Sequence, residues 1–371
     1  MQSIKEHNLK ANHNPKKNGI TKYHHYPLYF CSFSSPAIFR GTMMKTILSI
    51  VLMVASGLFM LFNFNACDSR SKVPPKENSV EEKPATKSAS IQQIISGERI
   101  VLSRARCLDC HSQRNWDVFG GPIVKGTEGM GGIMFNKEFG SVPGIVYARN
   151  ITPAGIGDWS DEELIRAITQ GITKKGDTLY PIMPYVFYNK MVREELEDVV
   201  AYIRTLKRVV NNMPERKLTV SASSAYPASL LTENIETNVK PSELDKVKHG
   251  EYLVTTAGCA NCHTPLNTKR EYQRDKMFSG GFRFKHEKFT AVSANITPDS
   301  PNGIGNWTEE VFLTKFKDYR DPSFYNYNPG RKNTFMPWLS FSQLDDYDLK
   351  AIYAYLRTVK PVSNKVEKFP E

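Results

Sequence analysis

The sequence predicts an all-α protein made of two tandem domains, each built of a few helices with long loops. Three observations support this fold class. The 371-residue chain repeats itself after about 152 residues, which indicates a domain duplication. The closing segment of each repeat carries one apolar stripe at helical spacing. No alternating run of apolar and polar residues is long enough to indicate a major sheet.

Short motifs recur in the same order in both halves of the chain. The first repeat contains Cys107-Leu-Asp-Cys110-His111, Asn150-Ile-Thr-Pro153 with Gly155-Ile-Gly157-Asp-Trp159, Met183-Pro184 and Ala201-Tyr-Ile-Arg-Thr205. The second contains Cys259-Ala-Asn-Cys262-His263, Asn295-Ile-Thr-Pro298 with Gly303-Ile-Gly305-Asn-Trp307, Met336-Pro337 and Ala354-Tyr-Leu-Arg-Thr358. Chance does not produce the same order of matches twice, so we expect the two halves to fold alike.

Helices are predicted at both ends of each repeat. Each repeat opens with a helical stretch ahead of its first cysteine. In the closing segments, apolar residues fall at offsets 0, 3, 4, 7 and 10 within residues 196–206 and again within residues 349–359. Ser160 and Glu163 form a capping box, so a further helix should begin there. Thr308, followed by two acidic residues, is the weaker counterpart in the second repeat.

Residues 44–66 are predicted to be an export signal of the lipoprotein type. Lys45 precedes an uncharged and mostly apolar run, and Ala66 stands directly before Cys67, whose thiol would be the lipid anchor. An uncleaved transmembrane helix over residues 46–64 is the alternative. Either way we expect an exported, membrane-tethered protein, facing the periplasm or the outer side of the cytoplasmic membrane.

The rest of the chain divides by composition. Residues 1–43 are interpreted as an extension ahead of the true start at Met43 or Met44, so no role is expected for Cys31. The remaining predicted parts are a flexible spacer at 67–91, a first domain at 92–210, a linker at 211–242 and a second domain at 243–365.

The charge of the protein does not indicate nucleic-acid binding. Residues 1–66 carry seven Lys or Arg and one Asp or Glu, so only +5 of the net charge of +11 belongs to residues 67–371. No basic run is interleaved with aromatic residues, as a nucleic-acid groove requires. We therefore expect no nucleic-acid partner.

The Cys-x-x-Cys-His motifs point to covalent haem. Two thiols three positions apart can form thioether bonds to the two vinyl groups of one porphyrin, and the adjacent histidine supplies a nitrogen to iron. The sequence thus predicts two haem c groups. Their thioether residues would be Cys107, Cys110, Cys259 and Cys262, and their first axial ligands His111 and His263.

Two other uses of cysteine pairs are less consistent with the motifs. A structural zinc site would join both pairs at one ion and would leave the two histidines as coincidences. A dithiol oxidoreductase would place one Cys-x-x-Cys in a βαβ pattern, which is absent here.

Methionine is the predicted second axial ligand of each iron. The first repeat has no histidine besides His111, which excludes a pair of histidines there. Met183 lies 72 residues after His111, and Met336 lies 73 residues after His263, each followed by proline. A methionine is more often core filler than ligand, but no other methionine has a counterpart in the other repeat. Trp159 and Trp307 either line the haem edge, bond a haem propionate, or pack in the core.

At these residues the chain resembles c-type cytochromes. It is especially similar to the multihaem cytochrome c subunits that take electrons from membrane-bound alcohol, aldehyde or sugar dehydrogenases. The resemblance covers roughly residues 92–210 and 245–362. Such subunits usually carry three haems, and this chain has two motifs. The resemblance implies a dehydrogenase as electron donor. We expect an oxidase or a soluble cytochrome as acceptor, and the leader predicts membrane attachment through a lipid or an N-terminal helix.

Two classes of function are consistent with these features. The first is electron transfer without catalysis, because iron with histidine and methionine on its two axial positions has no open site for oxygen or peroxide. This interpretation assigns no catalytic residue. The second is a dihaem redox enzyme, such as a peroxidase or a thiosulfate-oxidising cytochrome, which needs an axial position that opens or an unusual ligand. The two Met-Pro loops favour electron transfer.

Overall fold

The computed structural model describes residues 88–232, 234–267 and 271–371. The predicted extension at 1–43, the export signal at 44–66 and the lipid anchor Cys67 lie outside the described residues. Within the described part, no helix is long and apolar enough to cross a membrane.

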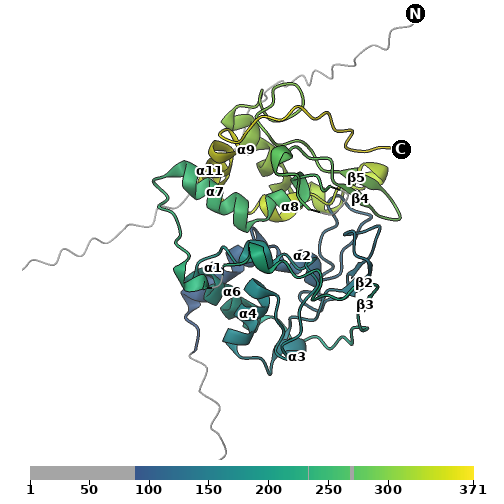
Figure 1. Ribbon diagram of the computed structural model, residues 1–371, viewed down its shortest axis with the longest axis vertical. Coiled ribbons are helices and arrows are strands. Elements are labelled where there is room, and N and C mark those ends of the chain that lie inside the picture. The colour runs from purple at the N-terminus through teal and green to yellow at the C-terminus, as the bar shows by residue number, and fades with distance from the viewer. Residues whose placement is uncertain (1–87, 233, 268–270) are drawn as a thin grey trace, which may run out of the picture. The chain divides into compact units, whose positions relative to one another are not determined.

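The described chain is mostly helical, as the sequence predicts (Figure 1). The first repeat contains α1 (Ile91–Leu102), α2 (Cys107–His111), α3 (Pro153–Ile156), α4 (Asp161–Gln170), α5 (Tyr185–Tyr188) and α6 (Arg193–Thr205). The second contains α7 (Lys246–Thr256), α8 (Cys259–His263), α9 (Glu309–Lys317), α10 (Trp338–Phe341) and α11 (Asp346–Leu356). Short 3-10 turns occur at Ala228–Leu230, Ile235–Thr237, Arg274–Lys276, Asp318–Arg320, Pro322–Tyr325 and Gly330–Lys332.

Helix starts follow the predicted capping residues. Ser160 accepts a hydrogen bond from the Glu163 amide and the Glu163 side chain returns one, so α4 begins with the capping box expected from the sequence. Thr308 caps α9 by accepting from the amide of Val311. Ser90 makes a further capping box at α1, which therefore begins at the last residue of the predicted spacer.

The first and last helices of each repeat cross at a glycine. Helix α1 packs on α6, and α7 packs on α11 (Figure 1). A Cβ atom added at Gly97 would lie 1.8 Å from the carbonyl oxygen of Asp198, and one added at Gly250 would lie 1.9 Å from that of Ala351. Only glycine lets the two backbones approach this closely, and both repeats use it at the same crossing.

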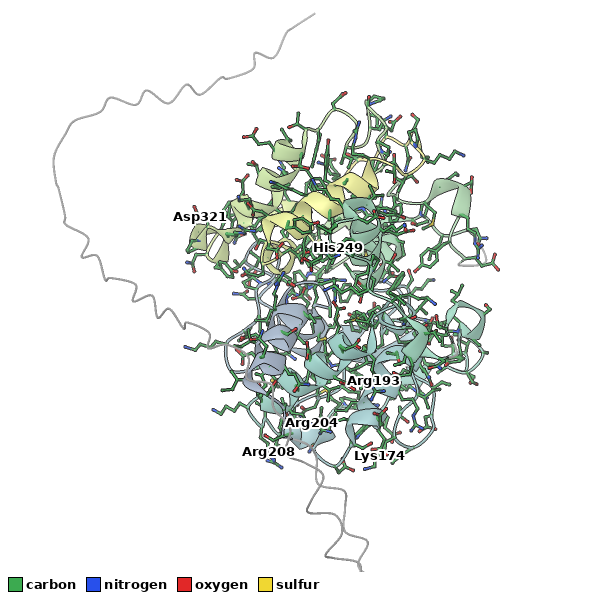
Figure 2. All side chains as sticks on the ribbon, turned by 90° about the vertical axis from the view of Figure 1, so that its left-hand side faces the viewer. Lys174, Arg193, Arg204, Arg208, His249 and Asp321 are labelled. Atoms are coloured by element: carbon green, nitrogen blue, oxygen red, sulfur yellow. The ribbon has the colours of Figure 1, made fainter. Side chains whose placement is uncertain are left out.

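The arginine of the Ala-Tyr-x-Arg-Thr motif ties the closing helix to the loop before α4 or α9. Arg204, labelled in Figure 2, donates to the carbonyl oxygens of Ile156, at 3.1 Å, and Trp159, at 2.5 Å. Arg357 donates in the same way to the carbonyl oxygens of Ile304, at 3.3 Å, and Gly305, at 2.8 Å. These bonds explain why the tryptophan loop and the closing helix recur together.

The strands are short and lie in the loops. The first sheet has the order β1 (Met134–Phe135), β2 (Gly144–Tyr147), β3 (Lys217–Leu218), and the second pairs β4 (Arg283–Lys285) with β5 (Thr290–Val292). All described pairings are antiparallel. Strands of two to four residues are too short for an alternating pattern, which is why the sequence did not reveal them.

The segment predicted to be the linker packs against the first repeat. Its strand β3 pairs with β2, and Ile235 is buried in the apolar cluster that contains α1 and α6. The hydroxyl of Tyr226 donates to the carbonyl oxygen of Gln170 at 2.7 Å. This segment is therefore held against the first repeat by backbone pairing, apolar packing and a side-chain hydrogen bond.

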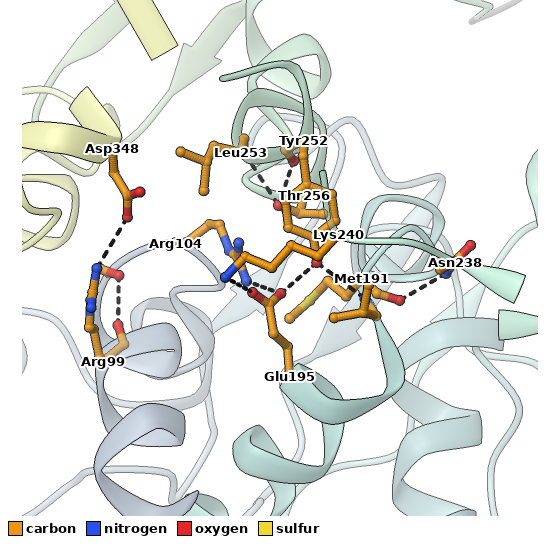
Figure 3. A network of polar contacts seen from close by, with 12 residues as sticks. Arg99, Arg104, Met191, Glu195, Asn238, Lys240, Tyr252, Leu253, Thr256 and Asp348 are labelled. Atoms are coloured by element: carbon orange, nitrogen blue, oxygen red, sulfur yellow. Dashed lines mark hydrogen bonds and ion pairs between the residues drawn. The ribbon is translucent and has the colours of Figure 1, made fainter. Parts of the chain in front are cut away.

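A buried polar network joins the two repeats (Figure 3). Arg104 forms an ion pair with Glu195, and both side chains are buried. From the second repeat, the Tyr252 hydroxyl donates to Glu195 at 2.5 Å and accepts from the amide of Val192 at 3.1 Å. Lys240 of the linker lies 3.4 Å from Glu195. The Glu195 carboxylate thus contacts residues of the first repeat, the linker and the second repeat.

Candidate haem sites

Each Cys-x-x-Cys-His motif forms a five-residue helix of its own, α2 or α8. The residue before each helix has a left-handed backbone, with φ of 52° at Arg106 and 67° at Gly258, so the chain turns sharply into the motif. Residues three apart share one face of a helix. The two thiols of each motif therefore lie on the same face, as bonds to one porphyrin require.

The four motif cysteines are free, partly buried thiols. Burial raises the pKa of Cys107 and of Cys259 to about 12, so both are protonated at neutral pH. Such thiols have the form that adds across a vinyl group to give a thioether. Among the residues that the structure describes, no three His, Cys, Asp or Glu side chains gather as a group that could hold a metal ion.

The motif histidines are held in the protonation state that iron requires. Nδ1 of His111 lies 2.6 Å from the carbonyl oxygen of Arg149, and Nδ1 of His263 lies 2.7 Å from that of Ala294. A carbonyl oxygen only accepts, so Nδ1 carries the proton and Nε2 keeps its lone pair. Burial lowers the pKa of both histidines, which favours the neutral ring. A neutral imidazole with a free Nε2 fits haem iron.

The Asn-Ile-Thr-Pro motif fixes the carbonyl that orients each histidine. Asn150 follows Arg149, accepts from the amide and hydroxyl of Thr152 at 2.9 and 2.7 Å, and donates to the carbonyl oxygen of Val209 at 2.7 Å. The corresponding bonds in the second repeat, at 2.9, 2.7 and 2.8 Å, join Asn295 to Thr297 and Val362. The motif thus ties the histidine's acceptor loop to the chain that follows the closing helix.

The sequence pattern did not predict that the Asn-Ile-Thr-Pro motif fixes this carbonyl. It indicated only that the motif is part of the repeat. A buried asparagine followed two residues later by threonine is the pattern of a local turn that bonds its own backbone. Its recurrence at Asn150 and Asn295 was the available signal. The partners Val209 and Val362 lie more than fifty residues further along the chain, and no local pattern indicates them.

The two Met-Pro loops lie in the same apolar clusters as the motif cysteines. Met183 and Cys107 both pack against the first cluster, and Met336 and Cys259 both pack against the second. In each loop the proline starts a four-residue helix, α5 or α10, and the residue after it donates its amide to the methionine carbonyl, at 2.9 Å and 2.8 Å. Each methionine is therefore presented by a fixed loop within its own repeat.

Comparison with known proteins agrees with this geometry. Residues 247–360 match the family model of cytochrome c. This chain is a cytochrome c family protein. It therefore binds haem c.

The similar proteins include dehydrogenase subunits and a dihaem cytochrome. The chain is 28% identical to the cytochrome c subunit of a quinone-dependent alcohol dehydrogenase from Gluconacetobacter polyoxogenes, over 69% of this chain and 54% of that protein. It is 28% identical to the fructose dehydrogenase cytochrome subunit of Gluconobacter japonicus, over 74% and 54%. It is 26% identical to a diheme cytochrome c-type protein of Cereibacter sphaeroides, over 72% and 86%. The chain thus spans about half the length of the dehydrogenase subunits.

Each cytochrome c domain places its Met-Pro helix against the Cys-x-x-Cys-His motif of the other. From α10, Ser340 donates to the Asp109 carboxylate of α2 at 2.9 Å. In the opposite direction, Phe187 of α5 lies beside Gly258, where an added Cβ atom would be 3.3 Å from the ring. Asp109 is also 3.5 Å from Arg114, so the first motif carries a paired carboxylate at this contact.

The tryptophans of the two cytochrome c domains pack in the cores. Trp159 belongs with the first apolar cluster and Trp307 with the second, and both are partly buried. Their backbone carbonyls accept hydrogen bonds from Arg204 and Tyr353. A role for either ring at the haem edge stays a prediction.

Proposed function

We propose that this protein transfers electrons through two covalently bound haems, one in each cytochrome c domain. The observation that carries the proposal is the duplicated histidine geometry beside a thiol pair, with Nδ1 donating to a carbonyl at 2.6 Å in one domain and 2.7 Å in the other. Bound haem supplies one-electron exchange between ferric and ferrous iron.

The residues have distinct roles in each site. The thiols of Cys107 and Cys110, or Cys259 and Cys262, would hold the porphyrin covalently. Nε2 of the motif histidine and the sulfur of Met183 or Met336 would be the protein ligands of iron. An iron held by both residues would have no free site for oxygen or peroxide, which supports electron transfer in preference to a peroxidase-type reaction.

The named relatives favour a dehydrogenase as the electron donor. Two of them are cytochrome subunits of an alcohol and a fructose dehydrogenase. We infer that a dehydrogenase subunit reduces one haem, and that electrons leave for an oxidase or a soluble cytochrome. Export through residues 44–66 and a lipid on Cys67 would place the protein on the outer side of the cytoplasmic membrane. Co-purification from detergent-solubilised membranes tests the partner, and Cys67→Ala, which should release the protein from the membrane, tests the anchor.

Haem counting tests the central claim. The full chain is produced where haem-attachment machinery is present, and its mass and haem content are measured. We expect two haems per chain, and one haem each in the double variants Cys107→Ala/Cys110→Ala and Cys259→Ala/Cys262→Ala. A colourless chain, or one haem in the unmodified protein, would contradict the proposal.

Absorption spectra test the ligands and the class of function. Two low-spin haems, each with the weak near-infrared band of methionine bound to ferric iron, are expected. Met183→Leu and Met336→Leu should each remove about half of that band. A high-spin haem in the resting protein would instead support a dihaem enzyme.

A further inference from the structure

Arg106 occupies a backbone conformation that costs free energy for any residue except glycine. Its φ of 52° lies in the left-handed region, and the corresponding residue before the second motif is Gly258, with φ of 67°. Gly258 adopts this conformation without strain because it has no Cβ atom. The arginine side chain must therefore make interactions that offset the strain in the first domain.

Those interactions reach into the second domain. Nη2 of Arg106 donates to the carbonyl oxygen of Ala257 at 3.0 Å, two residues before the second motif. The guanidinium carbon lies 4.9 Å from the centre of the Phe341 ring, on α10. The backbone of Arg106 thus leads into the first motif, and its side chain contacts the chain just before the second motif.

The positive charge of Arg106 has no ion-pair partner within hydrogen-bonding reach among the described residues. Nε is buried without a hydrogen-bond partner, and among the ion pairs of the described residues Arg106 takes part in none. The nearest acidic side chain in the motif, Asp109, is engaged by Arg114 at 3.5 Å and by Ser340 at 2.9 Å. Asp109 also favours the charged form of Arg106. In partly buried surroundings a charge acts on its neighbours more strongly than in water.

The charge of Arg106 lies near the motif cysteines of both domains. Arg106 directly precedes Cys107, and its guanidinium group bonds the backbone two residues before Cys259. One cation of the first domain is therefore placed between the two proposed haem-attachment motifs.

We propose that Arg106 is a positioning residue shared by both haem sites, and that its fixed charge raises the reduction potentials of both haems together. The inference rests on the proposed function, because it requires a haem at each motif. Ferric haem carries one more positive charge than ferrous haem. A nearby cation therefore disfavours the oxidised state more than the reduced state.

Redox titration of the intact two-haem protein tests this proposal. The variants are Arg106→Gly, which suits the left-handed backbone and removes the charge, Arg106→Gln, which removes only the charge, and Arg106→Lys, which keeps it. Arg208→Gln is the matched control, because Arg208 is an exposed arginine of the same domain (Figure 2).

At a fixed applied potential, we expect Arg106→Gly and Arg106→Gln to raise the ferric-to-ferrous ratio of each haem by about tenfold, a downward shift of 59 mV for one electron. Arg106→Lys should shift each ratio by less than about threefold, and Arg208→Gln by less than about twofold, because exposed charge is screened.

Three results would overturn the inference in a protein that retains two haems. The first is an unchanged potential of both haems in Arg106→Gly and Arg106→Gln, and the second is a shift confined to one haem. The third is an equally large downward shift in Arg106→Lys, which would assign the effect to geometry and not to charge. If the Arg106→Gly variant does not incorporate both haems, the reduction potentials of Arg106→Gln alone test the proposal. The haem count of the unmodified protein is measured first, so that a failure of the proposed function is recognised separately.

Discussion

The two histidines that we propose as iron ligands are oriented by carbonyl groups, and those carbonyls are held in turn by Asn150 and Asn295. The sequence proposes the cysteines, histidines and methionines as haem residues because each has a fixed chemistry and recurs in both repeats. The holding residues could not be predicted, because their partners are distant backbone carbonyls that carry no side-chain signature.

Asn150→Ala tests the importance of this support. The change removes the acceptor of two Thr152 hydrogen bonds and the donor to Val209, and leaves buried polar groups unsatisfied. We expect the free energy of unfolding to fall by about 1–3 kcal/mol. Urea unfolding followed by absorption at the haems measures it. Asn306→Ala, at an exposed asparagine, is the control, and equal losses in the two variants would refute the argument.

At the scale of elements, long helices were predictable and short ones were not. Helices α6 and α11 carry an apolar stripe over more than two turns, and α4 begins with a capping box. Helices α5 and α10 have four residues each, too few to show a period, and they exist because the preceding proline starts the turn. The strands are equally short and depend on partners across a loop.

Gly97→Ala tests the crossing of α1 and α6. The new Cβ atom would lie 1.8 Å from the Asp198 carbonyl oxygen, so the helices must move apart. Overpacking of this kind costs about 1–3 kcal/mol, which we expect as a loss in thermal stability. Glu98→Ala places the same residue type at an exposed position of the same helix and should change stability by less than about 0.5 kcal/mol. If Gly97→Ala were as stable as the unmodified protein, the two helices could accommodate a Cβ atom at the crossing and the argument would be wrong.

At the scale of the whole molecule, the buried polar network between the domains depends on residues outside the recurring motifs. Arg104, Glu195 and Tyr252 meet in the network of Figure 3, although no pattern in the sequence pairs them. A duplication predicts that the two domains fold alike, because the same motifs recur in the same order in each half. It does not predict the interface, where the two halves must differ to complement one another.

Tyr252→Phe tests the hydrogen bonds of this interface. The hydroxyl is the only atom removed, and it bonds both Glu195 and the amide of Val192. We expect a loss of about 1–3 kcal/mol in the free energy of unfolding, measured in urea. Tyr353→Phe removes a bond made wholly within the second domain, to the carbonyl of Trp307, and separates a local effect from one on the interface. An unchanged unfolding midpoint in Tyr252→Phe would mean that water replaces the hydroxyl without cost.

The charge of Glu195 gives the interface a dependence on pH. Burial alone would raise the pKa of Glu195, but Arg104 and the Tyr252 hydroxyl hold it below its usual value. A carboxyl whose pKa is lower in the folded than in the unfolded state stabilises the fold above the unfolded value of about 4.3. This contribution is lost as pH falls through the folded pKa.

Glu195→Gln should therefore lower the thermal-unfolding midpoint most at pH 7, because it leaves the buried Arg104 without its counter-charge. As pH falls below about 4, the unmodified protein loses the same charge by protonation, so the difference between the two proteins should shrink. Midpoints measured from pH 7 to about pH 3 give the comparison, with the exposed Glu98→Gln as control. A difference that stayed constant over this range would show that Glu195 contributes through its shape and hydrogen bonds, and that the ion pair does not set the stability of the interface.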